Sequence, residues 1–326
     1  MEVINIKGYG AYAPPLIVSN EDLSKIVDTS NEWIVTRTGI EERRISQGED
    51  TSSLATKAAQ TALDRANVLA EDIDLIVVAT ITPDMATPSV ACMVQKAIGA
   101  KNAMAFDVSA ACSGFIYGLE IAFSMMNSNN RFKKAVVIGA EVLSKILDWE
   151  DRSTCVLFGD GAGAVVLSKE ESDVEKLISF YSLSEGEKGD ALTSGSFDVL
   201  NPFVEEPVVK NKKVSMDGKE VFKFASGAMV NAINELLKKN NLTLDDIDHI
   251  VPHQANIRII EYTAKKIGVS LDKFYINLQK YGNTSSATIP LVLNDMYEAG
   301  MLTKGKKLIM VGFGGGLTFG STLIEL

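Results

Sequence analysis

An internal repeat constrains the fold of this chain more than any other feature of its sequence. An acidic turn that runs into an apolar segment occurs at residues 72–78 (DIDLIVV) and again at residues 246–251 (DIDHIV). Each segment follows a stretch with the apolar spacing of an amphipathic helix, at residues 53–67 and 224–239. The order of helix, acidic turn and buried strand is typical of α/β layers, so the repeat predicts an α/β protein.

Two further pairs of segments continue the repeat in the same order. The first pair precedes a turn and a helix, and the second precedes a glycine-rich bend and a closing strand: residues 103–108 and 273–278, then residues 134–139 and 307–312. Three matches in one order indicate a duplication, so we predict halves of residues 1–170 and 171–326 packed about a pseudo-twofold axis. Lysine-rich residues 208–216 indicate a solvated excursion joining the halves.

Composition and charge narrow the classes of function. The 326 residues carry a net charge of −10, which disfavours nucleic acid as a partner because phosphate binding needs a basic surface. No apolar run reaches membrane-spanning length and the N-terminus lacks the features of a signal peptide, so we expect a cytoplasmic protein that does not enter the membrane. Three cysteines without a CxxC spacing indicate a reducing compartment and no structural metal.

Cys112 is the candidate nucleophile. It lies among small residues at positions 109–114 (SAACSG), in a predicted turn between a strand and a helix. At a helix N-terminus the dipole and the N–H groups favour a thiolate and can also receive a developing oxyanion. A small buried hydrophobic residue is an equally good interpretation of this local sequence.

Two histidines and one asparagine favour a catalytic role for Cys112 over a packing role. His249 lies inside a strand-like run, which favours a packing role, whereas His253 follows that strand, where α/β sheets place their sites. Asn283 occupies the corresponding turn of the second half and could simply cap a helix. By the internal symmetry we take Asn283 as the counterpart of Cys112, which predicts that two helix N-termini face each other.

Two glycine-rich loops resemble cofactor sites. Residues 159–164 (GDGAGA) satisfy the dinucleotide pattern G-x-G-x-x-A, but that pattern must open a helix, and an apolar strand-like run follows instead. Residues 312–316 (GFGGG) also lead into a strand. We therefore expect no nicotinamide cofactor, although glycine in the second loop lets backbone N–H groups approach a reactive centre.

Taken together, these residues resemble β-ketoacyl-acyl-carrier-protein synthase III, a family of the thiolase-like superfamily. The resemblance runs from the first strand to the C-terminus. The motifs that carry it are the Cys112 turn and residues 28–34 (DTSNEWI), 37–40 (RTGI), 158–163 (FGDGAG), 253–256 (HQAN), 282–285 (GNTS) and 312–316. It implies a five-layered αβαβα fold of two similar halves, a homodimer, and no cofactor beyond the substrates acyl-CoA and malonyl-acyl carrier protein.

The resemblance also implies the reaction and the residues that perform it. Cys112 would take an acyl group from acyl-CoA, and malonyl-acyl carrier protein would then lose carbon dioxide and attack the acyl-enzyme to give a 3-oxoacyl product. The oxyanion hole would be the N–H groups of Cys112 and Gly315, and His253 with Asn283 would stabilise the enolate as neutral donors. Coenzyme A would contact Thr29, Trp33, Arg37 and Arg152, and the acidic carrier protein would dock on Lys223, Arg258, Lys265 and Lys266.

Two positions depart from the family pattern and three other functions stay open. Thr87 stands where some members carry a bulky aromatic residue that reaches into the partner's acyl pocket, which predicts primers longer than acetyl or branched; Lys219 replaces an amide near the pantetheine arm. The alternatives are a thiolase-like condensing enzyme of secondary metabolism, an acyl-CoA hydrolase in which His253 activates water, and a non-catalytic acyl-CoA-binding protein.

Overall fold

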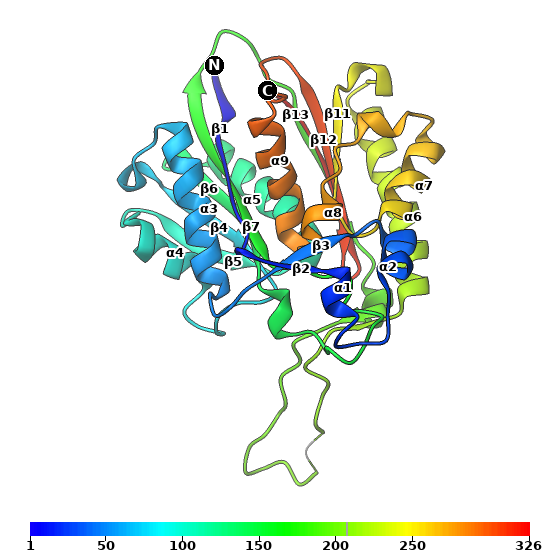
Figure 1. Cartoon of the computed structure of the whole chain (residues 1–326). Coiled ribbons are helices and arrows are strands. Elements are labelled where there is room, and N and C mark those ends of the chain that lie inside the picture. The colour runs from blue at the N-terminus through cyan, green and yellow to red at the C-terminus, as the bar shows by residue number, and fades with distance from the viewer. Residues whose placement is uncertain (207) are drawn as a thin grey trace.

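The computed structural model describes residues 1–206 and 208–326. Five layers run across the molecule in the order helices, sheet, helices, sheet, helices (Figure 1). This is the αβαβα arrangement that the resemblance implied. Three hydrophobic clusters fill the spaces between the layers: one lies between the two sheets and the other two lie under the outer helices.

The first sheet has five strands. In spatial order they are β1 (Glu2–Tyr12), β7 (Gly161–Glu171), β6 (Lys134–Glu141), β4 (Leu75–Ala79) and β5 (Met104–Val108). The last three strands are mutually parallel, whereas β7 is antiparallel to both β6 and β1. The carboxyl ends of β4 and β5 therefore open at one edge of the sheet, which is where an α/β protein places its site.

The second sheet repeats this order with four strands. They are β11 (His249–Pro252), β12 (Lys307–Gly314), β13 (Thr318–Glu325) and β8 (Ile178–Ser184). β11 is parallel to β12, and the other two pairings are antiparallel, as for β4, β6, β7 and β1 in the first sheet. The registers agree as well, since Leu75 pairs with Ala135 and His249 pairs with Leu308.

Edge strand β5 of the first sheet has no full strand as its counterpart in the described part of the second sheet. Residues 273–278 stand where β5 would be, and they form a single parallel bridge between Phe274 and Ile250. Beyond the bridge the Gln254 side chain replaces the missing ladder: its amide donates to the Tyr275 carbonyl at 3.2 Å and accepts from the Asn277 N–H at 3.2 Å. A side chain thus satisfies the backbone where the strand ends.

Six long helices form the three helical layers. One outer layer has α3 (Thr51–Ala66) and α4 (Val90–Ile98), the middle layer has α5 (Gly114–Ser128) and α9 (Thr288–Glu298), and the other outer layer has α6 (Gly218–Lys239) and α7 (Ile257–Ile267). The middle pair is buried between both sheets, with Phe115 and Val292 in one continuous cluster. Because α5 follows Cys112 and α9 follows Asn283, this layer sets the geometry of the candidate site. No helix in the described ranges is long and apolar enough to span a membrane.

Shorter elements connect these layers. The helices are α1 (Asn20–Leu23), α2 (Asn31–Thr38) and α8 (Leu278–Tyr281), and the strands are β2 (Leu16–Ser19), β3 (Glu42–Ile45), β9 (Leu192–Thr193) and β10 (Ser215–Met216). Short 3₁₀ helices are η1 (Ala70–Asp72), η2 (Ala111–Ser113), η3 (Leu143–Lys145), η4 (Gly186–Ala191), η5 (Leu244–Asp246), η6 (Leu271–Lys273) and η7 (Ser285–Ala287).

The solvated excursion includes residues 208–214, as the sequence predicted, but it is longer and does not join the two halves. It projects from the body of the molecule between β9 and β10 (Figure 1) and covers residues 194–206 and 208–214. The predicted position at the junction of the halves is wrong, because the chain passes from the first sheet to the second between β7 and β8. The excursion is apolar at several points, with Phe197 79% and Phe203 93% exposed.

Candidate active site

Cys112 lies in a sharp turn between β5 and α5, as its small neighbours predicted. The turn is the 3₁₀ segment η2, and Ala111 enters it with φ 45°, in the left-handed region that few side chains adopt. Such strain in a non-glycine residue persists only where the surroundings enforce it, and it is concentrated at functional sites. Cys112 itself is buried, with 7% of its surface exposed.

The thiol is not activated in the way the sequence predicted. We expected the helix N-terminus to favour a thiolate, but burial raises the pKa of Cys112 to about 12. The Ser285 side chain acts in the opposite direction and lowers this pKa, although less than desolvation raises it, and the charge of Glu141 raises it further. The thiol is therefore protonated in the free protein at neutral pH, and its proton must leave when a substrate arrives.

His253 is held immediately after β11 as a neutral side chain. Its Nδ1 lies 2.7 Å from Oγ1 of Thr288, and its ring packs edge-on against Phe313 with centroids 5.2 Å apart. Burial lowers the pKa of His253 to about 3, so the ring is uncharged at physiological pH. The other ring nitrogen, Nε2, is buried and has no hydrogen-bond partner among the described residues. It is the atom that remains for a ligand.

Asn283 is fixed through both its backbone and its side chain. Its N–H donates to the Leu157 carbonyl at 2.8 Å, and its carbonyl accepts from the Gly159 N–H at 3.0 Å. The side-chain Oδ1 accepts from the Ser285 N–H at 2.8 Å. Since a backbone N–H can only donate, this contact assigns the amide oxygen and leaves the NH₂ end as the donor for a ligand.

The internal symmetry does not pair Asn283 with Cys112, contrary to the sequence prediction. Ala111 and Ser285 both open a 3₁₀ turn with a positive φ, 45° and 51°, directly before the two central helices. This match makes Ser286 the counterpart of Cys112, three residues beyond Asn283. The two turns do lie against each other, as predicted, because Gly114 at the start of α5 approaches Ser286.

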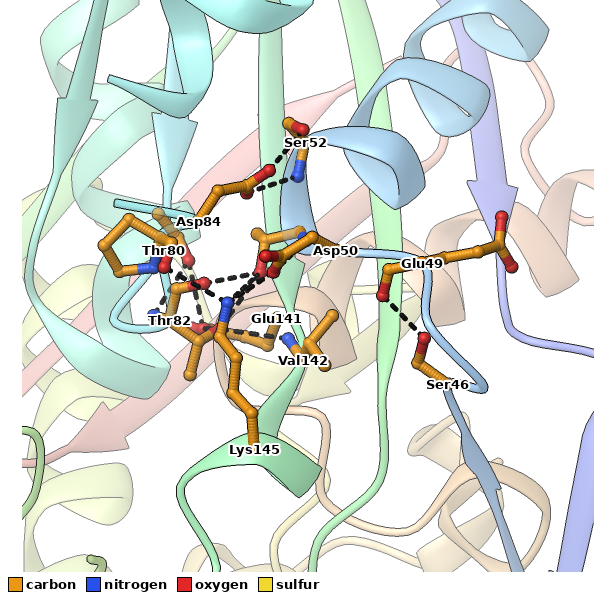
Figure 2. Close-up of polar contacts among 12 residues, drawn as sticks. Ser46, Glu49, Asp50, Ser52, Thr80, Thr82, Asp84, Glu141, Val142 and Lys145 are labelled. Carbon is orange, nitrogen blue, oxygen red and sulfur yellow. Dashed lines mark hydrogen bonds and ion pairs between the residues drawn. The ribbon is translucent and has the colours of Figure 1, made fainter. Parts of the chain in front are cut away.

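Ser286 of this counterpart turn contacts a buried carboxylate, Glu141, that was not predicted from the sequence. Glu141 ends β6 and accepts hydrogen bonds from the Ile81 N–H at 3.1 Å and the hydroxyls of Thr80 at 3.1 Å, Thr82 at 2.6 Å and Ser286 at 2.9 Å. Figure 2 shows Glu141 with Thr80 and Thr82, and the neighbouring polar contacts of Lys145 and Asp50. The only sequence signal was one acidic residue at the end of an apolar strand.

Two cavities meet at Cys112. The larger, of about 480 Å³, is lined by apolar side chains that include Ile81, Leu143, Phe158 and Leu192. The smaller, of about 90 Å³, is lined by His253 and Asn283 together with residues of α6 and α7. One thiol thus faces an apolar chamber on one side and two neutral polar side chains on the other, as acyl transfer followed by a second reaction requires.

The last glycine loop forms the wall beside Cys112. Gly314 lies so close that a Cβ there would be 2.6 Å from the Cys112 nitrogen, and Gly315 lines the larger cavity together with Cys112. Glycine is required here because the two backbones touch. The other loop, Gly159–Ala164, runs into β7 rather than into a helix, which confirms the predicted strand. In the described part of the chain no three His, Cys, Asp or Glu side chains form a metal-binding group.

Comparisons with known proteins find relatives over the whole length of the chain. The model of 3-oxoacyl-[acyl-carrier-protein] synthase III matches residues 106–186, and the model of its C-terminal part matches residues 237–326. The beta-ketoacyl-[acyl-carrier-protein] synthase III of Clostridium beijerinckii is 54% identical over 325 residues, covering 100% of each chain. That of Clostridium botulinum is 56% identical over 325 residues, covering 99% of each. The chain belongs to the β-ketoacyl-[acyl-carrier-protein] synthase III family.

Solved structures of synthase III proteins share the fold. The 3-oxoacyl-[acyl-carrier-protein] synthase III of Aquifex aeolicus superposes with a TM-score of 0.92 at 44% identity, covering 99% of this chain and 100% of its own. The priming beta-ketosynthase of the R1128 polyketide pathway superposes with a TM-score of 0.91 at 36% identity, covering 99% of this chain and 96% of its own. This chain is thus a thiolase-like protein of the synthase III family.

The residues that synthase III proteins imply for coenzyme A gather around Trp33. The guanidinium of Arg37 lies 4.5 Å from the centroid of the Trp33 ring, and that of Arg152 lies 5.3 Å from it. Arg152 also donates to the Asp28 carbonyl at 2.9 Å, beside Thr29. Trp33, Arg37 and Arg152 therefore form one cluster outside the two cavities at Cys112, and Thr29 adjoins it through Asp28.

The basic residues implied for the carrier protein are exposed on the outer helices. Lys223 lies on α6, and Arg258, Lys265 and Lys266 lie on α7. Val221, Phe222 and Ile259, which are close to Lys223 and Arg258 in the chain, line the smaller cavity. Lys223 and Arg258 are therefore beside the cavity that His253 and Asn283 line, whereas Lys265 and Lys266 lie in the last turn of α7.

The two departures from the synthase III pattern lie on the surface. Thr87 is exposed in the segment between β4 and α4 and lines neither cavity at Cys112 within one chain, so its effect on primer choice stays a prediction. Lys219 is exposed at the start of α6. His249, by contrast, is half-buried within β11, where its packing role was predicted.

Proposed function

We propose that this protein catalyses the initiating condensation of bacterial type II fatty-acid synthesis. An acyl group passes from acyl-CoA to Cys112, and a decarboxylative Claisen condensation with malonyl-acyl carrier protein then gives 3-oxoacyl-acyl carrier protein, coenzyme A and CO₂. The observation that carries the proposal is the junction at Cys112, where a large, mainly apolar cavity meets a smaller one whose lining includes His253 and Asn283. No metal and no cofactor besides the two substrates takes part.

In the first step the sulfur of Cys112 attacks the thioester carbon of acyl-CoA. The carbonyl oxygen becomes an oxyanion, which accepts from the N–H groups of Cys112 and Gly315. Collapse of the tetrahedral intermediate breaks the carbon–sulfur bond to coenzyme A, whose thiolate receives the proton lost by Cys112. Because the pKa of that thiol is raised to about 12, the proton leaves only as the attack proceeds. The acyl chain then lies in the larger, apolar cavity.

In the second step the malonyl group loses its carboxylate as CO₂. The electron pair of the broken carbon–carbon bond forms an enolate, whose oxygen accepts from His253 and from the Asn283 amide. The enolate carbon then attacks the acyl-enzyme carbonyl and expels the Cys112 thiolate, which takes up a proton from solvent to restore the resting thiol. Two neutral donors suit this step, and the depressed pKa of His253 keeps it neutral.

The proposal extends to the partners. We propose that acyl-CoA binds with its adenine at Trp33 and Arg152, and that the acidic carrier protein docks on the basic patch of α6 and α7. A homodimer is also proposed, since β5 is an edge strand with Met104 44% exposed, and an unpaired edge of this kind is a template for a second chain. Thr87 at such an interface would leave room for long or branched primers. These substrates place the reaction in the cytoplasm.

Intact-mass analysis with a panel of acyl-CoAs tests the proposal. Wild type should gain an acyl adduct that Cys112→Ala does not form, and the adduct should disappear on addition of malonyl-acyl carrier protein as a 3-oxoacyl product appears. His253→Ala and Asn283→Ala should still form the adduct but slow its condensation, roughly 100-fold or more.

Other outcomes would identify the rival functions. An adduct that hydrolyses without malonyl substrate indicates a hydrolase, and binding without any adduct indicates a non-catalytic protein. The similarity to the R1128 priming enzyme supports a second candidate, a priming condensing enzyme of secondary metabolism. Carrier proteins from the two kinds of pathway, compared as malonyl donors, distinguish it. A rate that strongly favours acetyl-CoA over longer and branched primers would refute the prediction from Thr87.

A further inference from the structure

A threonine outside the predicted site contacts His253. Thr288 is the first residue of α9 and is buried, and its hydroxyl oxygen has two neighbours. One is Nδ1 of His253 at 2.7 Å, and the other is the Ser285 carbonyl at 3.0 Å. A hydroxyl has one hydrogen, so it can donate to only one of these two acceptors at a time. Which one it chooses decides the tautomer of the histidine.

The two choices have opposite consequences for the site. If Thr288 donates to Ser285, Nδ1 of His253 must carry the proton and donate to the threonine oxygen, so Nε2 faces the cavity as an acceptor. If Thr288 donates to Nδ1, the proton of the neutral ring lies on Nε2, which becomes a donor. The 2.7 Å separation lies within the range of an O–H donor and of an N–H donor, so the contact itself allows both choices. The second choice is the one that gives the site a donor at Nε2, the buried ring nitrogen that has no hydrogen-bond partner among the described residues.

The other half of the chain provides an internal comparison. By the registers of the two sheets His253 corresponds to Ala79, and by the two 3₁₀ turns Thr288 corresponds to Gly114. Gly114 and Ala79 lie in the same mutual contact, since a Cβ on Gly114 would be 3.0 Å from that of Ala79. The duplicated scaffold thus brings these positions together in both halves, but only the second half has a hydroxyl and an imidazole there.

We propose that Thr288 is a positioning residue that holds His253 as the Nε2–H tautomer, so that the histidine can donate to the enolate oxygen. The inference rests on the proposed function, because the need for a donor comes from the decarboxylation step. Thr288 also connects the two donors of the site, since it lies against the Ser285 carbonyl while the Ser285 N–H holds the oxygen of Asn283. One turn of backbone therefore sets the positions of both side chains.

The tautomer can be measured directly in the resting protein. The chain has only two histidines, so ¹⁵N labelling of histidine gives a spectrum with two rings, and a His249→Gln variant assigns them. Two-bond ¹⁵N–¹H correlations distinguish Nδ1–H from Nε2–H. Wild type should show His253 with a protonated Nε2 and a bare Nδ1. A protonated Nδ1 would overturn the proposal, whatever the enzyme turns out to catalyse.

Kinetics of three variants test the consequence. Thr288→Val removes the hydroxyl with little change in shape, and Thr288→Ser keeps it. Thr263→Val is the matched control, because Thr263 is also a buried helical threonine, and among the described residues its hydroxyl bonds only to the Ile259 carbonyl within α7 and to the Met229 sulfur. Thr288→Val should form the acyl adduct at Cys112 within about twofold of the wild-type rate but condense it roughly 10- to 100-fold more slowly, as the loss of one hydrogen bond to a reacting group allows. Thr288→Ser should recover most of the condensation rate.

The outcomes separate this inference from the proposed function. If Thr288→Val slows adduct formation and condensation equally, or slows neither, Thr288 does not act through the donor role of His253 and the inference fails. If Thr263→Val shows the same selective loss, the effect belongs to buried threonines in general, and the inference fails as well. If wild type forms no 3-oxoacyl product at all, the proposed function fails, while the spectrum still reports the tautomer.

Discussion

The sharpest test of the site is a methyl group added at Gly314. A Cβ at this position would lie 2.6 Å from the nitrogen of Cys112, 3.1 Å from its Cβ and 3.2 Å from its Cα. Ordinary contact begins at 3.4 Å, so the shortest distance must open by about 0.8 Å. Because two of the three atoms belong to the backbone of the 3₁₀ turn, no side-chain rotation can relieve the contact.

The size of the effect follows from what that nitrogen does. Its N–H is one of two proposed oxyanion donors, and a donor displaced by about 0.8 Å from a hydrogen bond of about 2.9 Å no longer bonds. The loss of one oxyanion donor slows acyl transfer about 10²- to 10³-fold, equivalent to about 3–4 kcal/mol of barrier. Overpacking in a buried position also lowers the free energy of unfolding, by about 1–3 kcal/mol.

The assay is the initial rate of adduct formation at Cys112, followed by intact mass with one acyl-CoA. Gly227→Ala is the matched control, because Gly227 lies in α6 and a Cβ there meets nothing within 4 Å. Far-ultraviolet circular dichroism and a thermal melt check that Gly314→Ala is folded at the assay temperature. A folded Gly314→Ala protein that acylates within threefold of wild type would refute the proposed role of this wall.

Three further predictions concern the thiol, the buried carboxylate and the coenzyme A surface. Since burial raises the pKa of Cys112 to about 12, alkylation of this thiol by iodoacetamide should accelerate about tenfold per pH unit from pH 7 to 10. Peptide mapping separates the Cys112 product from that of the exposed Cys92. A rate that reaches a plateau below pH 9 would contradict the prediction. Glu141→Gln should lower the free energy of unfolding by about 2 kcal/mol, because an amide NH₂ replaces an acceptor among donors. Burial raises the folded-state pKa of Glu141, so the stabilising effect of this side chain is full below the unfolded-state pKa and declines as pH rises. The difference in free energy of unfolding between wild type and Glu141→Gln, measured by urea titration, should therefore shrink from pH 4 to 8. A difference that increases over this range would contradict the prediction. Trp33→Ala should raise the KM for acyl-CoA about tenfold and leave that for acyl-pantetheine unchanged, whereas equal shifts would rule out an adenine contact at Arg152 and Trp33.

The layers of this fold could be predicted because the spacing of apolar residues is repeated in the two halves of the sequence. Strands β4 and β11 and the helices before them follow directly from hydrophobic periodicity, and Cys112 and His253 were predicted because both follow strands of that pattern. The excursion was wrongly predicted to join the two halves for a related reason. A lysine-rich segment is typical of a linker, and nothing local shows that β8 precedes it.

The details of the site depend on backbone and burial that no local pattern reveals. The left-handed φ of Ala111 and Ser285 occurs at residues that rarely adopt it, so the match between the two turns, and hence the pairing of Ser286 with Cys112, was not visible. The raised pKa of Cys112 results from the number of atoms around it, which only tertiary packing sets. Thr288 was missed because a threonine in the first turn of a helix has no distinctive spacing.

The exposed excursion also determines where a protease can cut this protein. Phe197 and Phe203 project into solvent from a segment that belongs to neither sheet, so a chymotrypsin-like enzyme should cleave there first. The cut leaves β8 on the N-terminal fragment and β13 on the C-terminal fragment, yet these strands pair along seven residues. The nicked protein should therefore run as two bands on a denaturing gel but elute from a sizing column as one particle. Pairing between β8 and β13 thus lets the chain lose its covalent continuity at the excursion without losing its fold.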